Sequence, residues 1–211
     1  MSVTPILFPD LIQALIDTIE VHADEVTELD QAIGDGDHVF NLQRGLQALR
    51  EHAVEIALLD WPAAWQKIGM TVMAAVGGAS GSLYATLFIS LGKNSHDKTQ
   101  DLAGFAEAFQ LAVEAVKQRG KAEVGEKTML DVLVPVAQAL RQDAEASTPL
   151  VELLDHLCGV AEIGVEATRD MLATKGRASF LGERSKGHID AGAKTAQLMV
   201  AAIAEVLKKS Q

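Results

Sequence analysis

The sequence is poor in aromatic residues and nearly free of cysteine. Aromatic side chains make up only 4% of its 211 residues, and Cys158 is the one cysteine. A single cysteine excludes an intrachain disulfide, and we expect Cys158 to be a small buried apolar residue of a helix. The scarcity of aromatic residues, together with a 48% hydrophobic content rich in alanine and leucine, favours helices over a β-sandwich.

Positive charge is also scarce. Eighteen basic residues stand against 29 acidic ones, which gives a formal net charge of -11. Because no basic patch is available to neutralise phosphates, we expect no nucleic-acid partner. An anionic ligand would need a metal ion or local donors to bind. No lysine or arginine precedes Arg44, so we expect no signal peptide and a cytoplasmic location.

One long run without charge lies between Lys67 and Lys93. Its length would suit a membrane span, which needs about 20 apolar residues. However, residues 77–82 (Gly-Gly-Ala-Ser-Gly-Ser) divide the run, and each half is too short to cross a bilayer. We therefore expect two core helices joined by a glycine turn, and no membrane contact.

Alternating strand patterns are absent, and nearly every segment has a helical period. The expected helices cover approximately residues 10–27, 38–58, 62–77, 80–92, 102–119, 128–146, 149–173 and 191–209. Pro135 lies inside the sixth and should kink it or occupy its first turns. The sequence predicts one all-α domain over residues 1–211, built from eight antiparallel amphipathic helices.

Three connections are longer than a turn requires. They cover residues 29–37, 120–127 and 175–190, and the short turn 77–81 is a fourth candidate because it is rich in glycine. Loops that exceed their connecting duty are often functional. These four segments are therefore the candidates for a functional site.

The first loop carries Asp30, Asp35 and Asp37 beside His38. Three carboxylates on a glycine-rich turn repel each other unless a cation lies among them, and Mg²⁺ binds through carboxylates and substrate phosphates. A plain solvated turn is the alternative. An EF-hand is excluded because Leu46 stands where its twelfth, acidic ligand would be. The cluster predicts a metal site for phosphate chemistry.

The other loops carry groups that suit an anion. Residues 77–81 precede a helix, whose free N–H groups attract phosphate, although a plain corner capped by Ser80 is the simpler interpretation of this turn alone. Residues 120–128 imitate a Walker A loop, but Glu126 is one residue too many and the segment follows a helix, so we exclude a P-loop. It remains a candidate nucleotide-facing loop with Thr128 as a helix cap. Arg177 can clamp a phosphate, although a lone loop arginine is usually a surface charge.

Taken together, these motifs resemble those of one family, the nucleotide-binding L subunits of dihydroxyacetone kinase. The matching residues are Leu29-Asp30, Ile33-Gly34-Asp35-Gly36-Asp37-His38, Asn41, Arg44-Gly45, Val76-Gly77-Gly78-Ala79-Ser80-Gly81, Arg119-Gly120-Lys121-Ala122-Glu123, Gly125, Lys127-Thr128-Met129, Asp131, Gly176-Arg177-Ala178-Ser179 and Leu181-Gly182-Glu183-Arg184-Ser185. They run in order from about residue 10 to the end of the chain.

The resemblance implies a barrel of eight helices with the nucleotide site in the loops at one end. It implies that Asp30, Asp35 and Asp37 hold two Mg²⁺ ions that bridge the diphosphate of ADP or ATP. The nucleotide contacts that it implies are His38, Asn41, Ala79, Ser80, Gly120, Met129, Arg177, Asp190, Ala191 and Gly192. It assigns no firm catalytic residue to this chain.

The same resemblance implies a partnership. ATP-dependent members usually carry a sugar-binding K domain in the same chain, for which 211 residues leave no room. The sequence is therefore similar to the phosphoenolpyruvate-dependent type. There, a phosphohistidine partner converts bound ADP to ATP, and the phosphoryl group passes to dihydroxyacetone on the K subunit. The alternatives are an ATP-dependent kinase subunit for another small sugar or triose, and a nucleotide-sensing module that contacts a transcriptional regulator. We also expect a homodimer.

Two departures from the family pattern stand near the site. Val39-Phe40 replaces the small residues that commonly follow the histidine, and Ala191 replaces a frequent proline. We expect the bulk of Val39 and Phe40 to reshape the pocket near the phosphates. His38 itself argues against the related fatty-acid kinase domain, which typically has threonine there.

Overall fold

A computed structural model describes residues 4–210 of the chain, and over this range it contains helices and no strand. The α-helices are α1 (Phe8–Val21), α2 (Ala23–Ile33), α3 (His38–Ala57), α4 (Trp61–Ala75), α5 (Gly78–Ser95), α6 (Leu102–Gly120), α7 (Leu130–Glu145), α8 (Leu150–Ala167) and α9 (Ala191–Lys209). Three 3-10 helices are η1 (Pro5–Leu7), η2 (Thr168–Asp170) and η3 (Arg177–Ser185). The predicted all-α fold class is confirmed.

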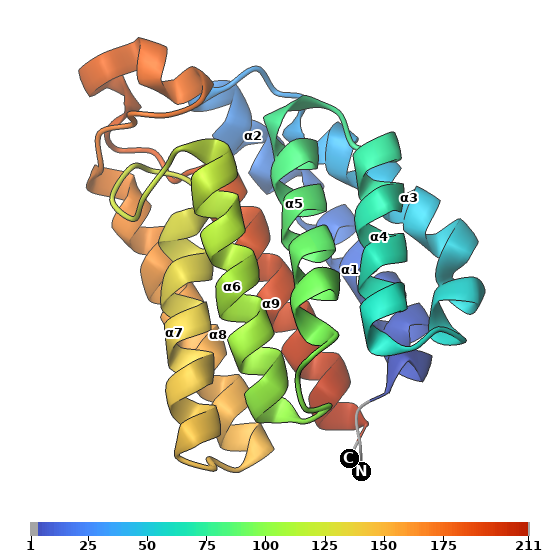
Figure 1. Cartoon of the computed structure of the whole chain (residues 1–211). Helices are drawn as coiled ribbons and strands as arrows, with labels where there is room; N and C mark the ends of the chain where they lie inside the picture. The colour runs from blue at the N-terminus through green and yellow to red at the C-terminus, as the bar shows by residue number, and fades with distance from the viewer. Residues whose placement is uncertain (1–3, 211) are drawn as a thin grey trace.

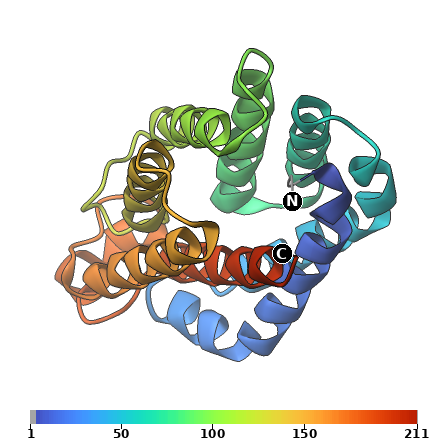
Figure 2. The same cartoon turned by 90° about the horizontal axis from the view of Figure 1, so that it is seen from below.

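The helices are arranged around a closed cycle (Figures 1 and 2). From α3 to α9 each helix packs against the next one along the chain, α1 packs against α3, and α9 returns to α1. The short helix α2 contacts α3 and α9. Because consecutive helices are antiparallel, the connections that precede α3, α5, α7 and α9 all lie at one end, at the top of Figure 1. This end carries the loops that the sequence singled out.

The first predicted helix, residues 10–27, is in fact two helices. α1 ends at Val21 and α2 begins at Ala23, with His22 at φ -99° and ψ 11° between them. The apolar stripe continues across the break to Val26, which is 1% exposed, so the periodicity alone did not reveal it. Residues 4–210 therefore contain nine α-helices instead of the eight expected. As a consequence α2 runs on to Ile33, and Asp30 lies on a helix rather than in a loop.

Other helix ends also differ from the prediction. α5 begins at Gly78 and α7 at Leu130, while α8 stops at Ala167, several residues before the predicted end at residue 173. η2 lies within the range predicted for the seventh helix, whereas η3 lies in the last predicted loop. Pro135 is inside α7, in its second turn. Cys158 lies on α8 as expected but is only half-buried.

The core is aliphatic along most of the cycle and aromatic at the end away from these loops. Alanines of α4, α5, α6, α8 and α9 are completely buried and let the helix backbones approach closely. At the opposite end, six rings form one connected group in which Trp65 contacts most of the others: Phe8, Trp61, Trp65, Phe88, Phe105 and Phe109. We call this group the aromatic cluster. Within residues 4–210, no helix has the length and apolarity that a membrane crossing requires.

Candidate functional site

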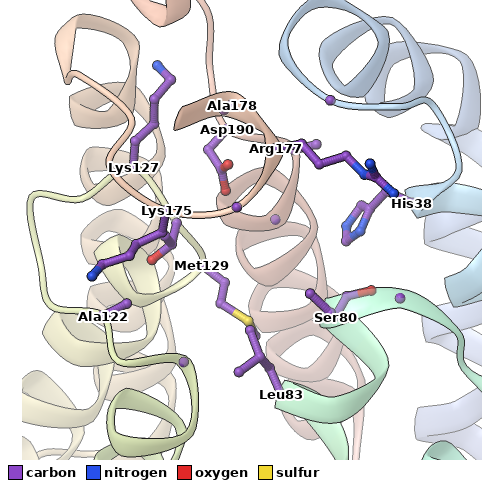
Figure 3. A pocket seen from close by; sticks show the side chains of 18 of the residues that line it. His38, Ser80, Leu83, Ala122, Lys127, Met129, Lys175, Arg177, Ala178 and Asp190 are labelled. Atoms are coloured by element: carbon purple, nitrogen blue, oxygen red, sulfur yellow. The ribbon is translucent and has the colours of Figure 1, made fainter. Parts of the chain in front are cut away.

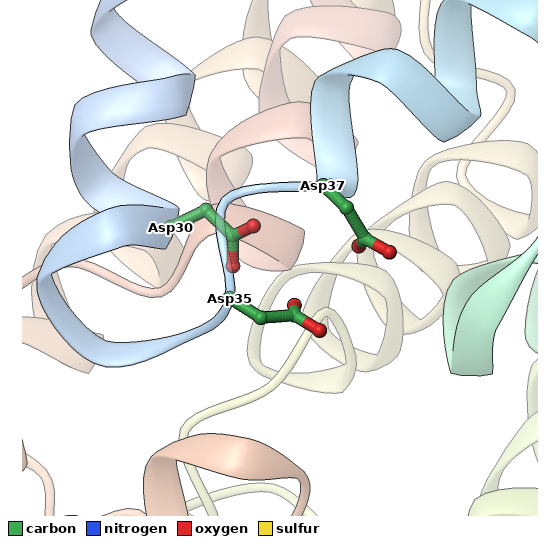
Figure 4. Close-up of side chains that lie close together, drawn as sticks. All are labelled: Asp30, Asp35 and Asp37. Carbon is green, nitrogen blue, oxygen red and sulfur yellow. The ribbon is translucent and has the colours of Figure 1, made fainter.

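Three carboxylates meet where α2 ends and α3 begins (Figure 4). Asp30 comes from the last turns of α2, Asp35 from the turn, and Asp37 from the residue that precedes α3. Each offers an oxygen, and these oxygens all lie within 4.8 Å of one another. Like charges this close repel each other strongly, whereas a hard divalent cation accepts several carboxylate oxygens. The sequence prediction that these three residues lie together is confirmed, and the donor set suits Mg²⁺.

The local chain is shaped to bring the carboxylates together. A Cβ atom at Gly34 would lie 2.0 Å from Asp30 Oδ1, so a side chain there would push the carboxylate away. Gly36 adopts φ 77°, which favours glycine. The backbone N–H of His38 donates to Asp30 Oδ2 at 3.2 Å. The two glycines and this hydrogen bond fold the turn around Asp30.

His38 is held beside the carboxylates by α9. Its Nε2 lies 3.0 Å from Thr195 Oγ1, and that hydroxyl donates to Gly192 O at 3.1 Å. Since the single hydroxyl proton is used on Gly192, the ring donates from Nε2, which leaves Nδ1 free. Burial lowers the His38 pKa, although the three aspartates act in the opposite direction. Burial therefore disfavours the charged form of this imidazole.

The loops at this end enclose a cavity of about 710 Å³ (Figure 3). The predicted site residues that line it are Asp30, Asp35, Asp37, His38, Ala79, Ser80, Gly120, Met129, Arg177, Asp190, Ala191 and Gly192. Apolar side chains of Leu83, Val116, Leu130 and Met129 form the wall from α5, α6 and α7. The cavity therefore has a charged side at the aspartates and an apolar side where a flat ring can pack.

The start of α5 supplies free backbone donors to the cavity. Gly77 is its N-cap and no side chain caps this helix end, so Ser80 does not act as the expected cap. Gly78 has φ 69° and lines the cavity with Ala79 and Ser80. The first N–H groups of a helix lack intrahelical partners and carry the positive end of the helix dipole. This helix end therefore has the free donors and the dipole direction that suit an anion.

Asn41 is the predicted contact that does not line the cavity. It is 6% exposed, and its Oδ1 accepts a hydrogen bond from Arg44 Nη2 at 3.2 Å. Arg44 Nε in turn donates to Ala75 O at 2.6 Å. A Cβ atom at Gly77 would come within 2.9 Å of both Asn41 Oδ1 and Arg44 Nη2. Asn41 thus supports the turn before α5 from below, and a direct nucleotide contact stays a prediction.

Val39 and Phe40 do not reach the cavity. Val39 is 5% exposed in the core, and Phe40 is 64% exposed on the outer side of α3, with the Arg44 guanidinium 5.7 Å from its ring centroid. The expectation that their bulk reshapes the pocket is therefore wrong. On a helix the two residues that follow His38 point in other directions, so their size acts on the core and on the surface.

Arg177 reaches the carboxylates from η3. Its guanidinium forms an ion pair with Asp35, although 69% of the side chain is exposed. In Figure 3 it points across the cavity towards His38. A guanidinium beside Asp35 offsets part of the repulsion among the three acids.

Asp190, a predicted site residue, precedes α9 and accepts a hydrogen bond from Ala193 N at 2.7 Å, and burial raises its pKa to about 7. Sequence reasoning missed the role of several other polar residues near the cavity. Asp131 is buried and accepts from Gly125 N at 2.5 Å and from Thr128 N at 2.7 Å, so it shapes the turn before α7. No motif signalled this role, although Asp131 belongs to the pattern that carried the resemblance.

Tyr84 and Arg119 are two further missed residues of the cavity wall. Burial raises the pKa of Tyr84 to about 12. Among the described residues its hydroxyl has no hydrogen-bond partner of normal geometry, although Thr195 is nearby. Arg119 Nε donates to Ser82 Oγ at 2.9 Å. Tyr84 lies within α5 and Arg119 in the last turn of α6, and an apolar period alone gives no sign of such contacts.

Comparisons with known proteins agree on one family. A family model described as the DAK2 domain matches residues 32–205. A Listeria innocua protein named PEP-dependent dihydroxyacetone kinase 1, ADP-binding subunit DhaL, is 42% identical over 174 residues, which cover 82% of this chain and 82% of the relative. The subunit of the same type from Escherichia coli is 38% identical over 194 residues, or 92% of each chain.

A solved structure has the same fold. It is described as the dihydroxyacetone kinase from C. freundii in complex with AMP-PNP and Mg²⁺, and it matches with a TM-score of 0.71 at 22% identity. The match covers 94% of this chain and 33% of that chain, so this chain spans about a third of its length. At this identity the likeness shows the fold alone. The chain therefore belongs to the DAK2 domain family, among the L subunits of dihydroxyacetone kinases.

Proposed function

We propose that the chain is the nucleotide-binding subunit of a phosphoenolpyruvate-dependent dihydroxyacetone kinase. The observation that carries the proposal is the convergence of three carboxylates, an uncapped helix start and Arg177 on one cavity of about 710 Å³. That volume lies within the range of small-molecule sites. The relatives named above as ADP-binding subunits support ADP as the ligand.

Different residues of the cavity would bind different parts of Mg-ADP. Asp30, Asp35 and Asp37 would hold two Mg²⁺ ions, which would neutralise the diphosphate when bound. The first N–H groups of α5 would donate to phosphate oxygens. Arg177 would leave Asp35 for a phosphate, because a guanidinium binds either anion with its planar fork. The apolar wall of Leu83, Val116, Leu130 and Met129 would pack against the base.

The reaction would consist of two transfers at the same place. In the first, the phosphoryl group leaves a phosphohistidine nitrogen of a donor protein and bonds to a terminal oxygen of ADP. In the second, the same group leaves ATP and bonds to a hydroxyl of dihydroxyacetone held on the K subunit. Such transfers depend mainly on positioning and charge neutralisation. This chain would therefore bind and position the nucleotide, and the group that activates the sugar hydroxyl would come from the K subunit.

Several further expectations are part of this proposal. They are the second Mg²⁺ ion, the closed helical barrel acting as a single nucleotide-binding domain, the homodimer and the cytoplasmic location. Contact with a transcriptional regulator is the remaining partner prediction. Residues of α2, α5, α7 and η3 line the cavity at the loop end of the helices. We therefore place the docking of both phosphotransfer partners at this end.

Reconstitution tests the proposal directly. The purified chain is mixed with a K subunit, a phosphohistidine donor, phosphoenolpyruvate and dihydroxyacetone, and the formation of dihydroxyacetone phosphate is measured without added ATP. We expect turnover, with ADP detected by native mass spectrometry of the purified chain. Turnover that needs free ATP and ignores the donor would show the ATP-dependent alternative. Nucleotide binding without any turnover would favour the sensing module.

A variant of the metal cluster links the reaction to the site. Asp30→Asn keeps an acceptor for the N–H of His38 but removes one charge, so we expect Mg-ADP binding and turnover to be lost while circular dichroism stays unchanged. Glu28→Gln on the same helix removes the same charge outside the cluster and should behave like the wild type. Wild-type ADP binding by Asp30→Asn would refute the metal assignment.

A further inference from the structure

The loop between α6 and α7 contains a lysine for which the proposed mechanism has no use. Lys127 stands where the sequence imitates a P-loop, yet its side chain is only 1% exposed. Its φ of 61° is left-handed, a conformation that is costly for a residue with a side chain. A buried ammonium group in a strained backbone persists only where other contacts compensate for both costs.

Those contacts are backbone carbonyl oxygens. Lys127 Nζ donates to Thr168 O at 2.5 Å and to His188 O, and it lies 3.4 Å from Arg169 O. An ammonium group has three donors and no acceptor, so three carbonyls satisfy it completely. Thr168 and Arg169 follow directly on α8, where the free carbonyls and the negative end of the helix dipole attract a cation. The site is built for this ammonium group.

The position of these carbonyls connects two walls of the cavity. Lys127 itself lines the cavity, two residues before Met129, and His188 is two residues before Asp190; Met129 and Asp190 line the cavity as well. The walls touch, since a Cβ atom at Gly192 would lie 3.7 Å from Met129 Cβ. A contact that holds the end of α8 to the segment before α9 therefore also fixes the distance between these walls.

The neighbouring residue makes a second tie to the same loop. Glu126 Oε1 accepts a hydrogen bond from Thr174 Oγ1 at 2.8 Å and lies 3.5 Å from Lys175 Nζ. These residues directly precede Gly176 and Arg177. Residues 126 and 127 thus hold the segment 168–190 at its beginning, in its middle and at its end. The turn after α6 is the anchor for the loop that carries Arg177.

We propose that Lys127 is a positioning residue, which sets nucleotide affinity by holding the end of α8 to the segment before α9 and does not touch the phosphates. Figure 3 agrees with this role, because the Lys127 side chain points away from Arg177 and His38. The inference rests on the proposed function, since it explains how the Met129 and Asp190 walls of that site are kept at a fixed spacing.

The affinities of Mg-ADP and of adenosine distinguish a lysine that positions the cavity walls from a lysine that contacts the phosphates. In Lys127→Met we expect both to fall by the same factor, about 10-fold or more, because the cavity walls contact the nucleoside part. Binding is measured at a temperature where circular dichroism shows a folded variant. Lys121→Met, in the same turn but exposed, should change neither affinity. A loss for Mg-ADP alone would show a phosphate contact, and unchanged affinities would show a purely structural lysine; either result overturns the proposal.

A measurement on the wild-type protein guards against a variant that does not fold. Brief treatment with acetic anhydride, followed by peptide mass spectrometry, reports which amines are accessible. We expect Lys127 to stay unmodified both without ligand and with Mg-ADP, while Lys121 reacts in both states. Reaction of Lys127 in the free protein with protection by Mg-ADP would overturn the proposal. If the wild type does not bind Mg-ADP at all, the proposed function fails, whereas a protected Lys127 would still show the carbonyl contacts.

Discussion

The two ends of the helical cycle are built in opposite ways. At one end the aromatic cluster fills the space between α1, α4, α5 and α6, with the ring centroids of Phe8 and Trp65 4.9 Å apart. At the other end, glycines, like charges and a buried carboxyl surround a cavity of about 710 Å³. Large apolar rings stabilise the folded state, whereas crowded carboxylates and an open cavity do not. The comparison indicates that the aromatic end stabilises the folded state enough to offset the destabilising carboxylates and cavity of the binding end.

The largest effect should come from the aromatic cluster. Trp65→Ala removes a ring that contacts those of Phe8, Trp61 and Phe88, so we expect a loss of about 3–5 kcal/mol in the free energy of unfolding. The affinity for Mg-ADP should stay the same, as measured by calorimetry where the variant is folded. Met70→Ala on the exposed side of α4 is the control. A large change in Mg-ADP affinity in Trp65→Ala would show that the aromatic end also determines binding at the cavity end.

The next effect is a pH dependence located at the cavity end. The pKa of Asp190 is about 7 in the folded protein and near 3.8 without the fold. The folded state therefore binds the proton more tightly, and its stabilising effect is complete below about pH 4 and lost as pH rises to 7. Relative to Asp190→Asn, the wild type should lose on the order of 1 kcal/mol per pH unit across this window.

Urea denaturation of the wild type and Asp190→Asn, without Mg²⁺ and between pH 4 and 8, measures this difference. The same titration on Trp65→Ala should show the pH dependence of the wild type, because its site lies at the other end. Parallel curves for the wild type and Asp190→Asn would show that the carboxyl is already ionised at low pH, against the assignment of a buried acid.

A third change acts on affinity through geometry alone. Gly34→Ala places a methyl group 2.0 Å from the present position of Asp30 Oδ1, so Asp30 must leave the cluster. We expect Mg-ADP affinity to fall by about 100-fold, which corresponds to about 2.7 kcal/mol. Gly159→Ala is the matched control, since a Cβ atom there meets nothing within 4 Å, and it should leave affinity unchanged. Equal affinities in the two variants would exclude a role for the turn around Asp30.

The smallest effect has opposite signs for two ligands. Arg177→Gln removes the ion pair with Asp35, so Mn²⁺ alone, followed by electron paramagnetic resonance, should bind more tightly than to the wild type. Mg-ADP should bind about 10-fold more weakly, or about 1.4 kcal/mol, because a phosphate contact is lost. Arg184→Gln on the same 3-10 helix should change neither. Weaker binding of both ligands would mean that Arg177 supports the cluster instead of competing for it.

Most helices could be predicted from the sequence, because the periodic spacing of apolar residues and the glycine turns are local signals. The break at His22 was missed, since the stripe of α1 continues to the buried Val26 and no glycine or proline marks the change. The three aspartates were found because they are close in the chain. The hydrogen bond between His38 and Thr195 was not predicted, because Thr195 is 157 residues away and the helical spacing of apolar residues says nothing about such a contact.

Lys127 shows why a sequence motif alone does not define the role of a residue. The sequence pattern excluded a P-loop but predicted no other role for the lysine, because the carbonyls that surround it come from residues 168–188. Phe40 shows the reverse case. A bulky residue beside a motif suggested a reshaped pocket, while the helix turns it to the surface. In both cases the direction of a side chain, which depends on tertiary contacts, decided the outcome.

The described ends of the chain lie together at the far side from the cavity (Figure 1). α9 begins at the cavity with Ala191 and runs for 19 residues to Lys209, so it carries the chain about 28 Å away from the cavity. A fluorophore, purification tag or surface anchor attached there would leave the loops free for partners. A fused sugar-binding domain, by contrast, would need a linker that returns along the outside of the helices before it could deliver a substrate.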